Sequence, residues 1–576
     1  PCTWQAVPGK FASDFSADVV FTYGLDLAKA FCVDLGSLCS AVVCQKAACS
    51  VRAGTELYST PRSEITYVKQ CGPAGSRVDD ECLAGAVPAS PRELGIAAKH
   101  RDLRGSAIVI LAHNRKNDLR QCLESLFSLP DIGLFRIHVS LDDAEAKPAM
   151  EAVVEELMSQ KGVDIEVWLH GPLEQDPLRH NAEVRHWFGM NAGKIAHHYW
   201  AAFEKTFMEH NYSHAIFVEE DLVFSPDFLS LFRSSAWLLE ADPSLWCVSA
   251  WNDFGTAAGT SDPCRLQRTS YFPGLGFLLT RAAWLRLREA WPTAPTMGWD
   301  YWMRVAFRRE GKECIIPEVS RSHHVSETGS SITKKKQLKL FKLMAFAQLP
   351  STCGAEGPCR HFGDVSYLLE DAYEQWLRGA VSGAPRLSFS ELKRADASPD
   401  PGRLHVLPYV REELTGEKAE LLGLAPKGTK GSIPADVRSE HYGVVVGRHV
   451  KSRARVLLVD RRSARGYLEP GEQLYLSSEC VMVAGNQGES CAAACTSKGM
   501  RCDKAQLHFA NDCRALRRHF PCREGCAHQV GEELPVYVPD PQQPTYGQCL
   551  VTFISKLVCE AKHPSTSRLC TCMPLH

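Results

Sequence analysis

The chain has 576 residues, of which 45% are hydrophobic, so it is long and apolar enough to bury several cores. Its 65 lysines and arginines against 67 acidic residues leave a net charge of -2, which gives no indication of a nucleic-acid or anionic-membrane partner. The length predicts about three or four domains.

The cysteines gather in two groups at the ends of the chain. Seven of the 24 lie between Cys2 and Cys82, and eleven lie between Cys480 and Cys572. Such dense groups predict small disulfide-bonded modules, which form in the secretory pathway or outside the cell. Zinc binding is the weaker alternative, because the sequence contains no Cys-x2-Cys pair. Both groups have odd counts, so either a disulfide joins two modules or a thiol stays free.

The sequence shows no pattern typical of a membrane-spanning helix. The sequence contains no run of about 18 apolar residues, the length that a membrane-spanning helix needs. Because the chain begins at Pro1 and has no signal-like start, we expect a signal or anchor segment to precede it. Any attachment is therefore expected only through an anchor outside this chain.

In chain order, the first predicted unit is a cysteine-rich module over residues 1–85, followed by a linker over residues 86–104. The next domain, expected over residues 105–345, opens with the apolar run 108–111, which is typical of a buried parallel strand. Leu119, Cys122, Leu123 and Leu126 follow at helical spacing.

Strand and helix patterns then alternate, which predicts an α/β layered fold. Further strands are expected at residues 137–141, 165–168, 215–218, 246–249 and 277–280, and helices around residues 150–158, 195–203 and from residue 281 onward. We expect the sheet to end near residue 280.

The remainder is predicted to form a second lobe over residues 346–475 and a cysteine-rich module over residues 476–576. Within the second lobe, the apolar runs 442–446 and 454–459 predict a hairpin.

An acidic triplet, Glu219-Glu220-Asp221, directly follows the predicted strand 215–218. Ligands of open α/β sheets bind outside the carboxyl ends of strands, which favours a functional triplet over a solvated loop. Carboxylates at the end of a buried strand are costly without compensating charge, and a hard divalent cation with a diphosphate would supply it. Manganese or magnesium would suit this site.

A second acidic residue, Asp300, lies between Trp299 and Tyr301. Aromatic surroundings would raise the pKa of its carboxyl toward working pH, as a general base for a hydroxyl requires. The alternative is a structural role, either as a helix cap or as the partner of Arg304.

Other polar residues are weaker candidates. Arg115 follows the first strand and could hold phosphate, although a surface arginine is the commoner case. Asp142 ends the second strand and could accept hydrogen bonds from a nucleoside. The pairs His197-His198 and His323-His324 are interpreted as packing residues more than as ligands. The glycine-interrupted run 272–277 predicts either a close approach to a ligand or another backbone, or a tight turn.

Together these segments resemble the β-1,2-N-acetylglucosaminyltransferase family, whose members act on N-glycans or on protein-linked O-mannose. The resemblance covers about residues 107–349 and is carried by KIAHHYW, FVEEDLVFSPDF, DPSLWCVSAWND, FPGLGFLLTRAAW, GWDYWMR and ECIIPEVSRSHH. It implies a GT-A nucleotide-sugar fold, UDP-GlcNAc as donor, manganese as cofactor, and inverting transfer of GlcNAc to the 2-hydroxyl of a mannose.

The resemblance also implies roles for individual residues. Asp221 aligns with the metal ligand, Asp300 with the general base, and Cys247 and Cys314 with a disulfide. The positions that align with donor binding are Arg115, Asp142, His198, Glu219, Glu220 and Ser331, with Glu220 facing the ribose.

The acceptor is less determined than the donor. The Glu-Glu-Asp triplet and ECIIPEVSRSHH are closer to the O-mannose enzymes, whereas DPSLWCVSAWND is closer to the N-glycan enzymes. We expect a Golgi enzyme that adds GlcNAc to the α-1,3-mannose arm of N-glycans on glycoproteins. The alternatives are an O-mannose enzyme and an inactive carbohydrate-binding protein.

The two ends resemble other proteins. Residues 547–574, with Cys549, Cys559, Cys570 and Cys572, are similar to the cysteine-rich C-terminal segment of N-acetylglucosaminyltransferase V. The spacing of Cys32, Cys39, Cys44 and Cys49 resembles an apple or PAN-type module. Both are therefore interpreted as accessory modules.

Overall fold

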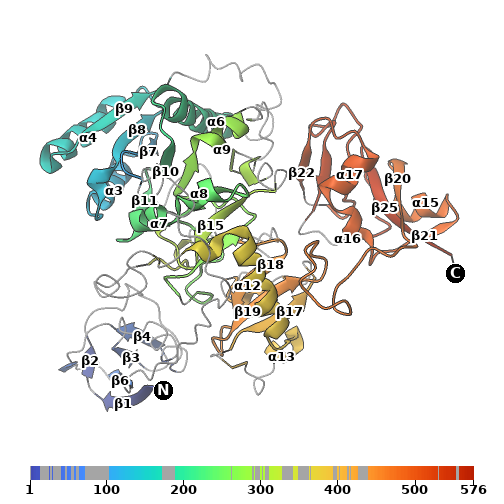
Figure 1. The fold of residues 1–576 in the computed structure, drawn as a ribbon, viewed down its shortest axis with the longest axis horizontal. Helices are drawn as coiled ribbons and strands as arrows, with labels where there is room; N and C mark the ends of the chain where they lie inside the picture. The colour runs from blue at the N-terminus through green and yellow to red at the C-terminus, as the bar shows by residue number, and fades with distance from the viewer. Residues whose placement is uncertain are drawn as a thin grey trace.

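The computed structural model describes most of residues 103–170, 189–288, 311–326, 365–393 and 439–575, with shorter pieces between these ranges and between residues 2 and 71. The described part forms a large sheet lobe, a second lobe next to it and a C-terminal module at the side (Figure 1). Within that part, no helix is both long and apolar enough to cross a membrane.

An eight-stranded mixed sheet forms the first lobe. Its strands, in spatial order, are β13 (Leu266–Thr269), β15 (Glu313–Pro317), β12 (Leu245–Ser249), β14 (Phe277–Thr280), β10 (His214–Glu219), β7 (Ala107–Ala112), β8 (Arg136–Leu141) and β9 (Ile165–Leu169). The β10-β7-β8-β9 half is parallel, and β14 runs antiparallel to both β10 and β12. The predicted α/β class is confirmed.

Both faces of this sheet are covered, which explains the continuous apolar strands. Along β7, Ile108 and Ile110 enter one core while Val109 and Leu111 enter the other, because successive side chains of a strand point to opposite faces. The helices α3 (Lys116–Phe127) and α4 (Lys147–Lys161) cover the first face, and α6 (Gly189–Glu204) covers the second. Shorter helices are α7 (Phe228–Ser235), α8 (Leu238–Ala241) and α9 (Arg281–Arg288).

The expectation that the sheet ends near residue 280 is wrong. The chain returns as β15, whose residues Cys314, Ile315 and Ile316 are fully buried between β13 and β12. A short apolar run far along the chain gives no local sign of which strand it will join. Cys247 and Cys314, for which the resemblance implied a disulfide, are bonded across neighbouring β12 and β15.

The second lobe contains a three-stranded sheet, in the order β17 (His405–Tyr409), β19 (Arg455–Asp460) and β18 (Val444–Arg448). The predicted hairpin is confirmed, with Val444 opposite Val459 and Arg448 opposite Arg455. The helices are α12 (Glu370–Gly383), α13 (Phe389–Lys393) and α14 (Glu417–Leu421). Leu377 and Leu457 share a core with Ile108, so this lobe packs against the α3–α4 face of the first.

The C-terminal module is a small sheet held by disulfides. Its elements are β20 (Val481–Gln487), α15 (Cys491–Thr496), β21 (Met500–Cys502), α16 (Leu507–Ala510), α17 (Cys513–His519), β22 (Cys526–His528), β23 (Val536–Tyr537), β24 (Cys549–Val551) and β25 (Ser567–Pro574). The bonded pairs are Cys491–Cys570, Cys495–Cys572, Cys502–Cys559, Cys513–Cys526 and Cys522–Cys549. The odd count in this group is explained by Cys480, which is a free thiol.

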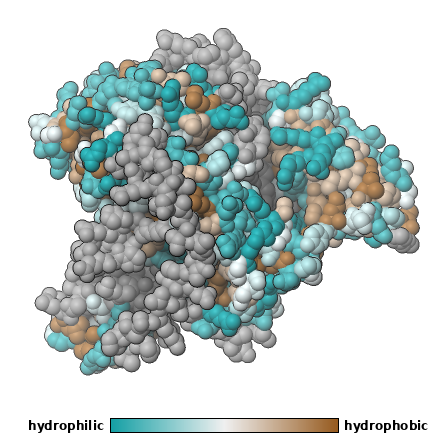
Figure 2. Space-filling view, viewed as in Figure 1, coloured by the Kyte–Doolittle hydropathy of each residue, from teal (hydrophilic) through white to brown (hydrophobic). Residues whose placement is uncertain are grey.

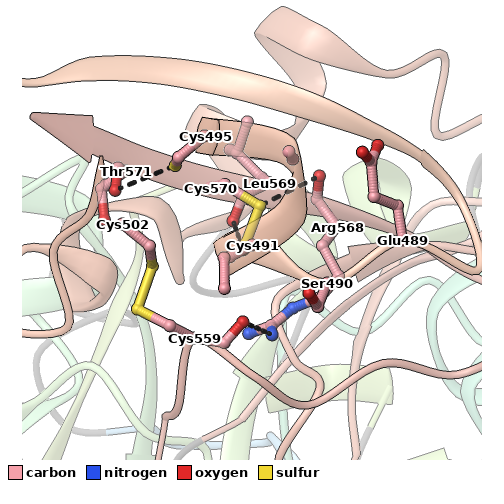
Figure 3. The surroundings of a disulfide bond; sticks show 12 residues. Glu489, Ser490, Cys491, Cys495, Cys502, Cys559, Arg568, Leu569, Cys570 and Thr571 are labelled. Atoms are coloured by element: carbon pink, nitrogen blue, oxygen red, sulfur yellow. Dashed lines mark hydrogen bonds between the residues drawn. A yellow bond between two sulfur atoms is a disulfide. The ribbon is translucent and has the colours of Figure 1, made fainter. Parts of the chain in front are cut away.

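One buried arginine supports the disulfide network of this module (Figure 3). The Arg568 guanidinium donates hydrogen bonds to the carbonyls of Val558 and Ala561, beside Cys559. Burial lowers the pKa of Arg568 to about 10. Apolar residues gather on the visible face of this module, whereas hydrophilic residues cover most of the visible first lobe (Figure 2).

The described strands of the N-terminal region form two small sheets. A four-stranded sheet has the order β1 (Cys2–Pro8), β6 (Glu64–Cys71), β3 (Ala41–Gln45) and β4 (Ala48–Arg52), and β2 (Lys10–Ala12) pairs with β5 (Leu57–Ser59). Cys44 and Cys49 are bonded across the β3–β4 hairpin. The likeness to an apple or PAN-type module stays a prediction.

Candidate functional site

The candidate site lies where β7, β8 and β10 end. His113 and Arg115 follow β7, Asp142 follows β8, and Glu220 and Asp221 follow β10. These strands are parallel neighbours, so their carboxyl ends meet at one edge of the sheet and bring the polar residues together.

Two acids of the triplet are buried and the third, Glu219, is half-buried, so the triplet is not a solvated loop. Glu220 is 1% exposed and Asp221 is 3% exposed. Arg115 joins them, because its Nε donates to Glu220 Oε1 at 2.8 Å and its Nη1 donates to Asp221 Oδ2 at 2.7 Å. The guanidinium expected to be either a phosphate ligand or a surface group is therefore engaged with the triplet itself. Its contact with a donor stays a prediction.

The two carboxylate oxygens of Asp221 differ, because Oδ2 has polar contacts and Oδ1 has no hydrogen-bond partner among the described residues. Besides Arg115, His324 Nε2 lies 3.0 Å from Oδ2, whereas Oδ1 is buried and has no hydrogen-bond partner among the described residues. Burial alone would raise the pKa of Asp221, but the hydrogen bonds and charges of His324 and Arg115 outweigh it and hold that pKa below its usual range. This carboxylate therefore stays ionised.

The donor set fits a hard divalent cation. A buried carboxylate oxygen without a partner is the kind of ligand that Mg²⁺ and Mn²⁺ prefer. No group of three His, Cys, Asp or Glu side chains that could hold a metal occurs in the part of the chain that the structure describes. A cation here would thus depend on Asp221 together with oxygens from a ligand or water, an arrangement that is usual for Mg²⁺ at phosphate-binding sites.

Glu219 and Glu220, the other two acids of the triplet, have pKa values above the usual range of glutamate. Burial, aided by the charge of Asp221, raises the pKa of Glu219 to about 7 although the Tyr199 hydroxyl donates a 2.6 Å hydrogen bond to it. Burial likewise raises the pKa of Glu220 to about 7, against the opposing effect of Arg115. Both groups therefore titrate near neutral pH.

A second polar cluster surrounds Asp142. His113 Nδ1 lies 2.7 Å from Asp142 Oδ1, and His198 Nδ1 lies 3.6 Å from Oδ2. His198 Nε2 is 2.8 Å from Ser140 Oγ, and burial lowers the pKa of His198. The predicted residues Asp142 and His198 thus meet, and His198 is a neutral member of this cluster. The adjacent His197 stacks on Trp200, which agrees with a packing role.

Asp300 follows Trp299, whose ring contacts Tyr199. The neighbouring ring of Trp299 stacks on Tyr199 with centroids 3.6 Å apart. Burial raises the pKa of Tyr199 well above its usual range, and the charges of Glu219, Asp221 and Asp300 raise it further. Tyr199 is therefore a group whose pKa is affected by the charges of both Asp221 and Asp300.

The surroundings of Asp300 differ from the expectation in one respect. Its aromatic neighbours predicted a carboxylate enclosed away from water. This prediction is wrong, because the Asp300 side chain is 41% exposed. Arg304 Nη2 lies 2.9 Å from Asp300 Oδ2, which is the alternative pairing that the sequence also allowed. Trp299 turns into the core while Asp300 faces outward, because adjacent helical residues point about 100° apart.

The run 272–277 is a tight turn. Gly274, Leu275 and Gly276 have φ of 70°, 49° and 92°, so two of these left-handed positions are occupied by glycine. The carbonyls of Gly274 and Leu275 accept hydrogen bonds from Ser249 and Ser322. The predicted turn is present, and a close approach of the run to a ligand stays a prediction. Ser331 lies outside the described residues.

Three residues of this site, His113, Tyr199 and His324, are not predicted for it by the sequence patterns. Tyr199 and His324 come from other elements than the acids they contact, and local periodicity marks both as core residues. His113 directly follows a buried strand, and that position is the signal that could have identified it.

The chain is 28% identical over 360 residues to an Arabidopsis thaliana alpha-1,3-mannosyl-glycoprotein 2-beta-N-acetylglucosaminyltransferase, covering 62% of this chain and 73% of that one. Among solved structures, a Pyrobaculum calidifontis mannosyltransferase in complex with GDP-Man and Mn²⁺ is 14% identical with a TM-score of 0.26, over 49% of this chain and 76% of that one. Mouse xyloside xylosyltransferase 1 is 12% identical with a TM-score of 0.26, over 43% of this chain and 95% of that one.

TM-scores of 0.26 support no conclusion about this chain. Residues 89–470, in contrast, match the GNT-I family, and this range contains the sheet lobe, the site and the hairpin of the second lobe. The chain is a glycosyltransferase that belongs to the GNT-I family.

Proposed function

We propose that the chain is an inverting transferase that moves GlcNAc from UDP-GlcNAc to the 2-hydroxyl of the α-1,3-linked mannose of N-glycans on glycoproteins. The observation that carries the proposal is the buried Asp221 carboxylate, whose Oδ1 has no partner among the described residues, at the strand-end edge of a GNT-I family sheet. An acid for a metal and an acid for a proton are the two groups that this transfer requires. The name of the Arabidopsis relative supports the choice of acceptor.

The donor would bind along the sheet edge. Asp142 and His198 would receive the nucleoside, and Glu220, held by Arg115, would face the ribose. Asp221 would hold Mn²⁺, or Mg²⁺, through its unengaged Oδ1. When bound, the cation would supply Lewis-acid stabilisation of the departing diphosphate.

Asp300 would act on the acceptor. Its exposed carboxylate would accept the proton of the mannose 2-hydroxyl while that oxygen forms a bond to the anomeric carbon. The bond from the anomeric carbon to the diphosphate oxygen would break on the opposite side, which inverts the centre and releases UDP. Arg304, 2.9 Å away, would hold the carboxylate in one orientation. Because the Asp300 carboxylate is exposed, a large glycan acceptor can reach it.

We also propose that the protein works in the Golgi lumen. The disulfides of the C-terminal module and the Cys247–Cys314 bond require an oxidising compartment.

The decisive experiment measures UDP release by purified protein with Mn²⁺ and UDP-GlcNAc. We expect turnover with an N-glycan that ends in α-1,3-linked mannose and little with a mannosyl-threonine peptide. The reverse preference would identify an O-mannose enzyme, and no release on any terminal mannoside would leave a carbohydrate-binding protein.

The variant Asp300→Asn tests the base. We expect a loss of kcat on the order of 10²–10⁴-fold, which is the usual contribution of general-base catalysis. Binding of UDP-GlcNAc should be unchanged. The variant Asp371→Asn, an exposed acid at the start of α12, is the matched control and should keep full activity.

A further inference from the structure

We propose that His324 is a positioning residue for the metal site. It holds the Asp221 carboxylate in an orientation that leaves Oδ1 available for a divalent cation. The inference rests on the proposed metal-dependent transfer and adds to it a residue whose sequence pattern indicates only packing. His324 lies about a hundred residues after the triplet and belongs to a different strand.

The backbone fixes His324 beside the triplet. Strand β11 (Leu222–Phe224), which directly follows Asp221, pairs antiparallel with β16 (Ser322–His324), and Leu222 lies opposite His324. The backbone N–H of Val325 donates to the carbonyl of Asp221 at 2.9 Å. These bonds hold the histidine next to the acid without any contribution from either side chain.

The imidazole has one hydrogen-bonding contact among the described residues. Its Nε2 lies 3.0 Å from Asp221 Oδ2, whereas Nδ1 is buried and has no partner there. The ring is stacked on Phe341, with centroids 4.7 Å apart and planes 12° from parallel. Stacking and burial fix the plane of the ring, so its Nε2 is directed at Oδ2.

Two donors on the same oxygen restrict the carboxylate. Arg115 and His324 both contact Oδ2 of Asp221, so rotation of the carboxylate would break two interactions. Arg115 alone is a weaker restraint, because it also binds Glu220 and is 29% exposed. Without His324, the guanidinium could draw in both oxygens of Asp221 and occupy the one that a cation needs.

The neighbouring His323 provides a matched comparison. It lies on the same strand, but its side chain points to the opposite face, as successive residues of a strand do. Its ring contacts Phe346, with centroids 5.5 Å apart, and no contact to the triplet occurs among the described residues. Replacing His323 therefore disturbs β16 without touching Asp221.

The test measures Mn²⁺ affinity in the presence of UDP, from the electron paramagnetic resonance signal of free Mn²⁺. His324→Phe keeps the stacked ring and removes the donor, and we expect about a 10–100-fold loss of Mn²⁺ affinity, the usual cost of losing such a support. His324→Gln places an amide nitrogen near the position of Nε2 and should keep most of the affinity. His323→Phe should bind Mn²⁺ as the wild type does.

The outcomes separate the two proposals. Wild-type protein that binds no Mn²⁺ even with UDP would overturn the metal-dependent function, and the inference with it. Wild-type binding together with equal binding by His324→Phe would overturn the inference alone. If His324→Phe does not fold, as judged by circular dichroism, His324→Asn replaces it, since its shorter amide does not reach Asp221. Equal affinity of the Asn and Gln variants would then refute the inference.

Discussion

His441 Nδ1 lies 2.7 Å from Glu313 Oε1, and this contact joins the second lobe to β15 of the main sheet. The second ring nitrogen of His441 lies 3.0 Å from Glu374 on α12. Glu313 also accepts a 2.7 Å hydrogen bond from the buried Arg268. The two lobes are therefore joined by paired charges within the interior, where breaking a pair is costly.

This junction predicts a stability that depends on pH. Burial would raise the pKa of Glu374, but hydrogen bonds from His441 and Tyr467 outweigh it and lower that pKa to about 2. Because the folded-state pKa lies below that of the unfolded chain, the stabilisation is complete above about pH 4.5 and is lost as the pH falls toward 2. Glu374→Gln should thus cost at most about 3 kcal/mol near pH 6 and progressively less toward pH 3.

Urea unfolding at a series of pH values measures this difference. Glu370→Gln, which removes an acid that pairs with Arg465 at the surface, is the control and should cost less than about 1 kcal/mol. A cost of Glu374→Gln that does not change between pH 6 and pH 3 would contradict the assignment.

Tyr199→Phe should shift the pH profile of the enzyme. The Tyr199 hydroxyl lowers the pKa of Glu219, so its loss should move that pKa above about 7, and the phenylalanine keeps the stacked contact with Trp299. If donor binding needs ionised Glu219, the acid limb of log kcat/KM moves to higher pH. Tyr212→Phe, whose hydroxyl contacts His138 away from the triplet, should leave the limb in place.

Gly259→Ala should destabilise the contact between the lobes. A Cβ at Gly259 would lie 2.4 Å from the carbonyl oxygen of Gly423, a backbone atom that cannot move aside easily. We expect a cost of about 1–3 kcal/mol in the free energy of unfolding. At Gly379, on the exposed side of α12, a Cβ would meet nothing within 4 Å, and Gly379→Ala should stabilise the protein by about 1 kcal/mol. Equal effects of the two variants would refute the close packing.

The disulfide between Cys247 and Cys314 should stabilise the sheet lobe. It closes a separation of 67 residues, and replacing both cysteines with alanine should cost about 2–5 kcal/mol. Eleven of the 12 tryptophans lie between residues 168 and 376, so tryptophan fluorescence reports mainly unfolding of the transferase lobes. The double alanine variant of Cys513 and Cys526 should leave this transition unchanged, and a shift as large as that of the first variant would show that the C-terminal module supports the sheet.

Local hydrophobic patterns were sufficient to predict the strands and helices that bury one face or both. The apolar run at residues 108–111, the helical spacing after it and the hairpin at Val444 and Val459 each follow from a period of two or 3.6 residues. The place of Glu219-Glu220-Asp221 at a strand end was also visible, because an apolar run that stops at charged residues marks that boundary.

What the triplet contacts was decided by the tertiary structure alone. Arg115 reaches it because β7 lies next to β10, and His324 reaches it because β16 pairs with β11. The same holds for β15, which entered the sheet beyond its expected end, and for Asp300, which faces outward. A residue's periodicity reports whether its own face is buried, whereas its partners depend on strand order and on pairing between distant segments, which no local pattern encodes.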